Sequence, residues 1–426
     1  MKKSLLALLF LACSAASLAR DTLTVMHYNL LYYGITTSFC NNQNNNVDLK
    51  DQYLSNIIDF VRPDIFTVNE LGRGQDNANR ILDNVMNVVG NNRYSAASYT
   101  NTTNSTIVNM LYYDHNKFSL YFEAVVANLM RDINLYTLYY NDQEMLAAGD
   151  TIFLTAIVAH LKAGGAAEDQ QTRTAEAQAV MAYIYANNMK GNLLFLGDFN
   201  MGSSFEQAFQ HITYHPNEAI RFYDPINQPG QWYNNPNFAP YHTQSTRSGS
   251  HDCFVSGGLD DRYDLILASR AVMQGYYGLQ YIDGSYKALG QDGNRFNQSV
   301  IYPANNSAPQ VIIESLYGMS DHLPVVMKMR TDQITAGQQP LLASIPSIRF
   351  NNPAREHLNL QARQSATGLD IAIFSLTGEK VRAWTGLDLM AGEGQSFELS
   401  GLQPGVYLIR ALGKDILPFS AKLIKQ

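Results

Sequence analysis

Short apolar runs separated by polar turns occur along most of the chain. The runs are rich in β-branched and aromatic residues and too short for buried helices, which is typical of strands. They cover residues 23–28, 65–69, 106–113, 151–159, 193–196, 263–267 and 323–326. The pattern therefore predicts a set of buried strands.

Helical periodicity appears between several of these runs. Apolar residues recur at i, i+3, i+4 and i+7 in three segments, the spacing of one helix face. The three sets are Leu54, Ile57, Ile58 and Val61; Ala78, Ile81, Leu82 and Val85; and Ala177, Val180, Met181 and Ile184. Alternating strand and helix segments predict an α/β domain built in layers, with the helices covering the sheets.

The pattern changes in three places. The stretches 36–46 and 227–256 are rich in Asn, Pro, Gly and Ser, so we expect surface loops that set substrate choice. Residues 331–346 are predicted to be a linker. From 347 to 426, short alternating runs with Gly turns predict a small all-β sandwich. A chain of 426 residues, 46% of them hydrophobic, is long enough for two folded units.

The first 19 residues have the three regions of a secretory signal peptide. Lys2 and Lys3 are followed by an apolar stretch and by small residues ending at Ala19. The apolar part is too short to remain as a membrane-spanning helix. A lipoprotein signal through Cys13 is an alternative that the preceding residues fit poorly. We expect residues 1–19 to be removed on export and no transmembrane segment to remain.

Charge and cysteines limit the partners of the mature chain. The formal net charge is −7, and loss of Lys2 and Lys3 makes it more negative. This argues against tight non-specific nucleic-acid binding but not against a phosphodiester substrate, because a bound divalent cation reverses the local charge. Cys40 and Cys253 remain after cleavage. Export permits a disulfide between them, and two free thiols are an equally open alternative.

Polar side chains follow many of the predicted strands. The clearest case is Gly197-Asp198-Phe199-Asn200, directly after an apolar run. Similar positions are held by Asn29, Glu70, His160, Asp264, Asp321 and His322. Open α/β sheets place their chemistry at such strand ends, so these residues predict one catalytic site within residues 20–330.

The order of these motifs resembles the DNase I-like endonuclease/exonuclease/phosphatase superfamily. Its pattern is Asn, a Glu at a strand end, His, G-D-x-N, D-x-I and S-D-H, and the matching residues span about 20 to 330. The resemblance implies a four-layer α/β/β/α sandwich. It also implies a metal-dependent phosphodiester hydrolase.

The resemblance assigns a metal site. Glu70 is expected to be the main ligand, with Asn29 and Asp321 completing or bordering the coordination sphere. Mg²⁺ is the expected ion, with Mn²⁺ or Ca²⁺ as alternatives, because hard divalent cations prefer carboxylate oxygens.

The catalytic residues are assigned in the same way. Asp198 would orient or deprotonate the attacking water, and Asn200 would hold that water or a phosphoryl oxygen. His322 and Asp264 would form a carboxylate–imidazole pair. His160 would donate to a phosphoryl oxygen or protonate the leaving group. The resemblance leaves open whether Asp198 or His322 is the base.

The C-terminal unit resembles the sorting domain of type IX secretion cargo. The resemblance covers about residues 345 to 426 and includes the final Lys422-Leu423-Ile424-Lys425. It implies export through the periplasm with the type IX machinery as partner, and a secreted or cell-surface location. A carbohydrate-binding sandwich is the alternative, although the tail shows no aromatic platform.

Three functions follow from these observations. The leading one is a secreted nuclease that hydrolyses DNA, or RNA, with nucleic acid as its partner. The second is a sphingomyelinase-like phospholipid or phosphate-ester hydrolase, for which Trp232, Tyr233 and Phe238 would offer an apolar rim. The third is a non-catalytic surface adhesin, which predicts damaged site positions that this sequence does not have. The sequence determines neither endo or exo action nor the oligomeric state.

Overall fold

The structure is a computed structural model that describes residues 21–88, 92–142, 145–146, 151–249, 253–331, 348–362, 365–375, 380–413 and 419–426. The expected signal peptide lies outside these residues. So does the expected linker, apart from Thr331, which ends a strand. Within the described part, none of the helices combines the length and apolar character needed to cross a bilayer.

The first sheet contains the N-terminal strand. Its order is β11-β13-β1-β2-β4-β3, with β12 beside β13. Strands β1 and β2 run parallel, and the other pairings are antiparallel. The bounds are β1 Thr22–Tyr33, β2 Ile65–Gly72, β3 Tyr94–Ala96, β4 Ile107–Asp114, β11 Leu279–Tyr281, β12 Lys287–Ala288 and β13 Val325–Thr331.

The second sheet brings three predicted site residues together. Its order is β5-β6-β7-β8-β10-β9. The bounds are β5 Phe118–Ala127, β6 Ile133–Tyr140, β7 Phe153–His160, β8 Asn192–Asp198, β9 Phe222–Tyr223 and β10 Asp264–Ser269. Asp198 pairs with His160 on the parallel strand β7 and with Asp264 on the antiparallel strand β10. One end of this sheet therefore carries all three.

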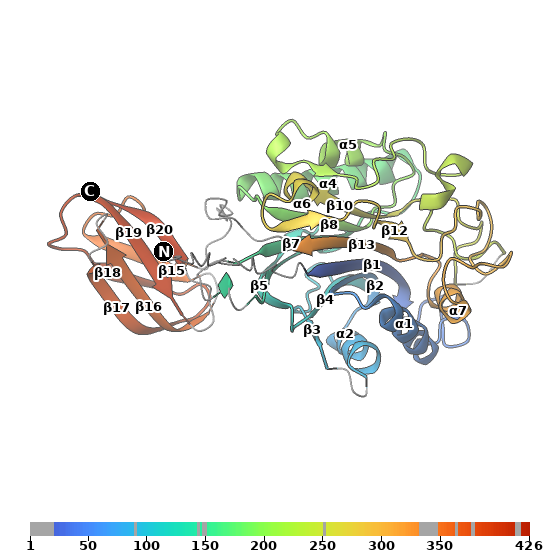
Figure 1. Ribbon diagram of the computed structural model, residues 1–426, viewed down its shortest axis with the longest axis horizontal. Coiled ribbons are helices and arrows are strands. Elements are labelled where there is room, and N and C mark those ends of the chain that lie inside the picture. The colour runs from blue at the N-terminus through green and yellow to red at the C-terminus, as the bar shows by residue number, and fades with distance from the viewer. Residues whose placement is uncertain are drawn as a thin grey trace, which may run out of the picture.

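Helices cover the outer faces of the two sheets (Figure 1). One side carries α1 Val47–Val61, α2 Gln75–Ile81 with its π-helical continuation η1 Leu82–Met86, and α7 Gln310–Met319. The other carries α4 Ala167–Ala186, α5 Gln207–Thr213 and α6 Arg270–Gln274, with the 3₁₀ turns η2 Glu218–Ile220 and η3 Pro236–Tyr241 in the connections.

The side chains of β8 alternate between two cores. Leu194 and Leu196 belong to the core that includes the first sheet, whereas Leu193 and Phe195 pack in the core that includes α4 and α5. Successive strand residues point to opposite faces, so this alternation requires a layer on each side of the sheet. The predicted four-layer α/β/β/α sandwich is confirmed.

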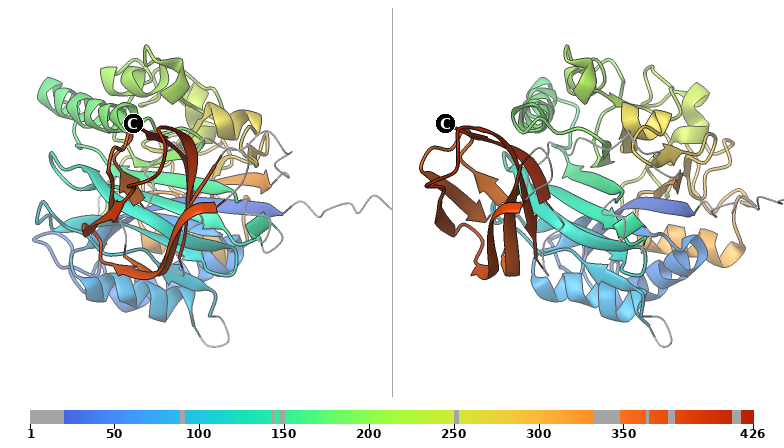
Figure 2. Two further views of the ribbon diagram at one scale, coloured as in Figure 1. Left: turned by 90° about the vertical axis from the view of Figure 1, so that its left-hand side faces the viewer. Right: turned by 60° about the vertical axis from the view of Figure 1, so that its left-hand side comes forward.

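The C-terminal strands form a sandwich with a core of its own. One sheet has the order β14-β15-β18 and the other β17-β16-β19-β20, shown in orange to dark red in Figure 2. The bounds are β14 Ile348–Phe350, β15 His357–Ala362, β16 Ala366–Phe374, β17 Lys380–Leu389, β18 Gly394–Glu398, β19 Gly405–Leu412 and β20 Phe419–Lys425. The predicted all-β sandwich is confirmed.

Candidate active site

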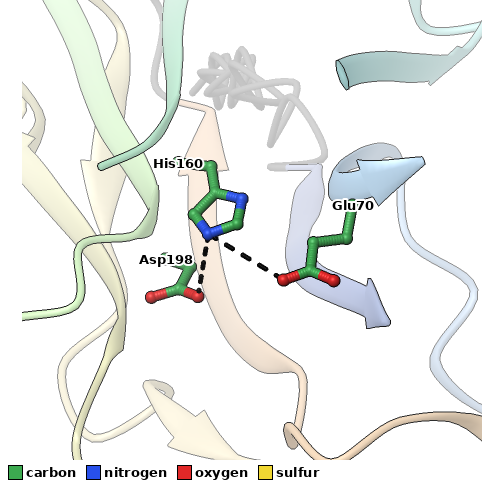
Figure 3. A group of neighbouring side chains, drawn as sticks. All are labelled: Glu70, His160 and Asp198. Carbon is green, nitrogen blue, oxygen red and sulfur yellow. Dashed lines mark ion pairs between the residues drawn. The ribbon is translucent and has the colours of Figure 1, made fainter. Parts of the chain in front are cut away.

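Glu70, His160 and Asp198 meet at the end of the two sheets. One ligand atom from each lies within 4.8 Å of the other two. His160 Nε2 is 3.9 Å from Glu70 Oε1 and 3.6 Å from Asp198 Oδ2. Figure 3 shows the imidazole pointing toward both carboxylates. Residues separated by up to 128 positions, from β2, β7 and β8, thus face one point.

Asn29 on β1 donates hydrogen bonds to both carboxylates of this group. Its Nδ2 donates to Glu70 Oε1 at 3.1 Å and to Asp198 Oδ2 at 3.0 Å. Its Oδ1 accepts the Leu31 N–H at 3.0 Å. The amide therefore presents nitrogen, not oxygen, to the carboxylates. Metal ligation by Asn29 stays a prediction, and in this geometry the side chain orients the carboxylates instead.

Irregular backbone geometry on β1 and β2 turns the Glu70 side chain toward the site. Glu70 has a φ of 55°, and the pairing register shifts next to it between β2 and β4. On β1, Leu31 and Tyr32 also have positive φ, and Tyr32 N–H donates to Glu70 Oε2 at 3.2 Å. Such bulges redirect a side chain, and non-glycine residues keep positive φ only where the surroundings impose it. Here the surroundings include a lysine on α1.

That lysine is Lys50, which sequence analysis did not assign to the site. It is 1% exposed, and its ammonium donates to the carbonyl oxygens of Leu30 and Leu31. Burial lowers the pKa of Lys50 to about 7, although the negative charges of Asp321 and Glu70 oppose this shift. A sequence signal existed, because Lys50 shares the helical spacing of the buried face of α1.

Gly197 allows β7 and β8 to pair closely enough to join His160 and Asp198. It has a φ of 151°, and a Cβ there would lie 1.8 Å from the Ala159 carbonyl oxygen. Only glycine fits this position. The glycine of the Gly-Asp motif is therefore required by strand packing.

Two asparagines bridge the sheets beneath Asp198. Asn69 Oδ1 accepts the Asp198 N–H at 2.7 Å, and Asn69 Nδ2 donates to Asn109 Oδ1 at 2.7 Å. Asn109 Nδ2 in turn donates to the Val158 carbonyl at 3.2 Å. Buried amides with satisfied partners fix a unique arrangement. They lock β2, β4, β7 and β8 together at the site.

Asn200 and its loop lie beside Asp198. The Asn200 N–H donates to Asp198 Oδ1 at 3.0 Å, and its side chain donates to the Leu161 carbonyl at 3.2 Å. Arg173, 1% exposed, bonds Glu206 in this loop at 2.7 Å and the Lys162 carbonyl at 2.8 Å. Arg173 thus joins the loops that follow β7 and β8.

His322 and Asp264 form the expected pair. His322 Nδ1 lies 2.7 Å from Asp264 Oδ2, and its Nε2 lies 2.7 Å from Gln244 Nε2 and 3.7 Å from Asp198 Oδ2. Burial lowers the pKa of His322, but Asp264 and Asp198 outweigh it and hold that pKa well above its ordinary value. His27, behind Asp264, is neutral at pH 7, since burial lowers its pKa to about 4.

The other titratable groups are shifted mainly by burial. Burial raises the pKa of Asp198 to about 7, against the opposing charge of His322. Burial also raises the pKa of Glu70, and Asp321 adds to that shift. It lowers the pKa of His160 well below the ordinary value. The site therefore holds two carboxyl groups that are difficult to ionise without added positive charge.

This donor set fits a divalent cation. Hard cations take carboxylate oxygens, and imidazole nitrogen is an accepted ligand for several metals. Asp321 accepts the Val255 N–H through Oδ2 at 3.1 Å, while its buried Oδ1 has no hydrogen-bond partner in the described part of the chain. The same holds for His160 Nδ1. Three residues were expected to bind the metal: Asn29, Glu70 and Asp321. Of these, Glu70 belongs to the group that it forms with His160 and Asp198.

Arg131 is a second residue that sequence analysis missed. It lies in the turn between β5 and β6, half-buried, and its charge adds to burial in lowering the pKa of His160. The next residue, Asp132, fixes this turn by accepting from Thr102 N at 2.7 Å. Among the described residues Arg131 has no hydrogen bond or ion pair. By contrast, Lys162 is paired with Asp169 at 2.6 Å.

Cys40 and Cys253 are joined by a disulfide. Of the two alternatives that the sequence left open, the structure has the bonded one. The bond connects loops 213 positions apart in the sequence.

Residues 350–426 match the family described as "Secretion system C-terminal sorting domain". These residues form most of the C-terminal sandwich. The match indicates export and a secreted or cell-surface location, and it implies the type IX secretion machinery as a partner. No curated protein matches the chain significantly.

Several solved structures are similar to most of the chain. Danio rerio TDP2 complexed with a single-strand DNA product is 12% identical, over 73% of this chain and 100% of that one, with a TM-score of 0.46. An endonuclease/exonuclease/phosphatase family protein from Bacteroides thetaiotaomicron is 14% identical over 74% and 96%, with a TM-score of 0.45. The human Nocturnin catalytic domain with bound sulfate is 14% identical over 74% and 98%, with a TM-score of 0.42.

Proposed function

We propose that the protein is a divalent-metal-dependent phosphodiester hydrolase that acts outside the cell on nucleic acid, with DNA as its leading substrate. One observation carries this proposal. Glu70, His160 and Asp198 face one point, and the His322–Asp264 pair adjoins it. The proposal includes a catalytic domain at 20–330, joined by a linker at 331–346 to a sorting domain at 347–426, after removal of residues 1–19.

Asp198 is the better candidate for the base. In hydrolysis, water adds to phosphorus, the ester P–O bond breaks, and the departing oxygen receives a proton. A base works best with a pKa near the operating pH, and burial raises the pKa of Asp198 to about 7. Asn200 N–H and Asn29 Nδ2 hold its two oxygens in place. The carboxylate can therefore accept a proton from water without reorienting.

His322 suits the opposite role. Asp264 and Asp198 hold the pKa of His322 well above its ordinary value, which favours the doubly protonated ring, and Asp264 accepts the Nδ1–H. His322 is proposed to donate from Nε2 to a phosphoryl or leaving oxygen, and for this the Gln244 amide nitrogen, 2.7 Å away, would have to turn aside. His160, with its lowered pKa, is neutral and offers Nε2 toward Glu70 and Asp198. A cation held by Glu70 and His160, with Asp321 nearby, would neutralise charge on the phosphoryl group and leave Asp198 beside it free to accept the proton from water.

Arg131 supports an anionic, extended substrate. A guanidinium at the site that has no partner among the described residues is suited to bidentate contact with a phosphate. A nucleic acid presents a phosphate on each side of the one being cut. Arg131 is therefore proposed to contact the substrate backbone and not to take part in proton transfer.

Exposed apolar loop residues favour a second candidate, a phospholipid hydrolase. Exposed apolar side chains lie in loops adjacent to site residues: Phe39, Leu129, Met130, Phe205, Tyr233 and Val255, each between 44% and 70% exposed. Met130 precedes Arg131, and Val255 N–H binds Asp321. Exposed apolar side chains in loops near a site suit contact with a lipid surface. The expectation that Trp232 belongs to an apolar rim was wrong, because it is fully buried against Phe209.

A substrate panel tests these alternatives. Purified mature protein would be incubated with plasmid DNA, RNA and sphingomyelin vesicles, each with Mg²⁺ and with EDTA. We expect DNA cleavage in Mg²⁺, none in EDTA, and recovery on adding excess Mg²⁺. Hydrolysis of vesicle lipid without DNA cleavage would replace the nuclease by the second candidate. If none of the three substrates is cleaved with Mg²⁺, Mn²⁺ or Ca²⁺, the result would favour a non-catalytic surface adhesin.

The affinity for Mg²⁺ should fall as the pH falls. Asp198, whose pKa is raised to about 7, carries a proton below that pH, and the cation must displace it. Affinity should be full above about pH 7 and about tenfold weaker at pH 6 than at pH 8, since each pH unit below a pKa changes the ionised fraction about tenfold. Calorimetric titration with Mg²⁺ measures this. The same affinity at both pH values would contradict a cation site beside Asp198.

A further inference from the structure

The disulfide joins two loops, each of which supports or supplies a backbone donor to a carboxylate of the site. Cys40 lies in the loop between β1 and α1, and its side chain is fully buried. Cys253 lies in the segment that precedes β10. Neither cysteine contacts the cluster of Glu70, His160 and Asp198 directly. The connection runs through backbone donors in both loops.

The loop of Cys40 supports the donor to Glu70. Asn45 in this loop donates to the carbonyl oxygens of Leu31 and Tyr32, each at 3.2 Å. The Tyr32 N–H donates in turn to Glu70 Oε2 at 3.2 Å. The loop is also closed on itself, because Thr37 N–H donates to the Cys40 carbonyl at 2.7 Å. A fixed Cys40 therefore means a fixed donor to Glu70.

The loop of Cys253 supplies the donor to Asp321. Val255, two positions further along, donates its N–H to Asp321 Oδ2 at 3.1 Å. Its carbonyl accepts the Ser245 hydroxyl. The intervening Phe254 ring stacks under the Arg247 guanidinium at 3.6 Å. These contacts are weaker than a covalent bond, so the disulfide is the strongest restraint on where Val255 places its N–H.

We propose that the Cys40–Cys253 disulfide is a positioning device that completes the cation site only when it is oxidised. This inference rests on the proposed function. With the bond formed, the two loops cannot separate, so the N–H donors that orient Glu70 and Asp321 stay in place. With the bond broken, the contacts with Ser245 and Arg247 would keep the loop of Cys253 nearby but would not hold the Val255 N–H at its position beside Asp321. Asp321 then loses its fixed donor, and the cation loses a correctly placed carboxylate.

Export gives this device a use. The C-terminal sorting domain indicates that the chain leaves the cytoplasm, where thiols are kept reduced, for compartments where disulfides form. Two thiols and the disulfide of an exchange partner give the Cys40–Cys253 bond and two thiols on the partner, so protons and electrons balance. The site would be incomplete in the cytoplasm, where the cell keeps its own phosphodiesters, and complete once the chain has left the cytoplasm.

Calorimetric titration with Mg²⁺ tests the inference on the full-length mature protein. Three samples are compared: the oxidised protein, the protein reduced with dithiothreitol until both thiols react, and the C40S/C253S variant. We expect Mg²⁺ to bind about tenfold more weakly to the last two, as second-shell changes typically produce, with an unchanged circular-dichroism spectrum. Oxidised glutathione should restore affinity to the reduced protein and leave the variant unchanged.

Leu279→Ala is the matched control for a general loss of stability. Leu279 is fully buried on β11 and pairs with Thr331, at the opposite end of β13 from His322. It should lower the melting temperature and leave Mg²⁺ affinity as in the oxidised protein. Equal affinity in the oxidised, reduced and C40S/C253S proteins would overturn the inference, as would equal weakening by Leu279→Ala. If even the oxidised protein binds no Mg²⁺, the proposed function itself fails.

Discussion

Asp198→Asn should lower the turnover number by about 10³-fold or more, within the range that a positioned general base contributes. The change keeps the size of the side chain and removes its ability to accept a proton. It also sets an amide against the Nδ2 donor of Asn29, 3.0 Å away. Turnover would be measured on the substrate that the panel identifies, at saturating Mg²⁺, beside a thermal melt that checks folding.

Asp114→Asn provides the control for this variant. Asp114 is a buried aspartate at the other end of β4 from the site, and it is paired with Arg93 at 2.6 Å. The same chemical change there removes a buried ion pair and should lower the melting temperature while leaving turnover within about twofold. Near-normal turnover in Asp198→Asn would remove that carboxylate from the mechanism.

Strand ends were the part of the site that the sequence predicted well. The short apolar run before Asp198 predicted a buried strand, and the structure shows why the run is apolar at every position: its residues pack in two different cores on alternate sides of the sheet. Which strands lie beside it was not readable from the run itself. The resemblance implied only that these strand ends meet at one site, and the strand order and the register that set His160 and Asp264 opposite Asp198 came from the structure.

Loop residues were the part that the sequence could not predict. Arg131 lies in a bend and Gln244 in an isolated β-bridge, and in both places the backbone path decides where the side chain points, which polar loop composition does not reveal. The orientation of Asn29 depends on the positive φ at Leu31, which no propensity predicts. The disulfide partners are far apart in sequence, so loop composition could not bring them together. Lys50 is the exception, since its helical spacing was available.

The charges of the site also explain why an acidic protein can carry this chemistry. Two carboxyl groups have raised pKa values because burial disfavours their ionised forms. The same burial makes a cation more effective there than in water. Under the proposed function, the local charge would be set by the bound ion and by Arg131, and the net charge of the chain would matter little at the site.

Asp264→Asn should lower the turnover number by about 10³- to 10⁴-fold, the scale seen when the carboxylate behind a catalytic histidine becomes an amide. Asp264 Oδ2 accepts the Nδ1–H of His322 at 2.7 Å and is a main cause of its raised pKa. An asparagine can turn its N–H toward Nδ1 and fix the other tautomer. The pKa of His322 should then fall, and the fraction of protonated His322 at neutral pH should fall with it.

Two measurements separate this effect from a loss of folding. NMR titration of His322 should show the lower pKa directly, and turnover should decline toward high pH at a lower pH than in the wild type. Asp224→Asn is the control, since the Asp224 side chain is 8% exposed and accepts two hydrogen bonds from Arg262 at 2.9 and 2.8 Å. The Asp224→Asn variant should have a lower melting temperature and an unchanged turnover number. An unchanged His322 titration in Asp264→Asn would contradict the pairing, because the lost charge lies in direct contact with the ring.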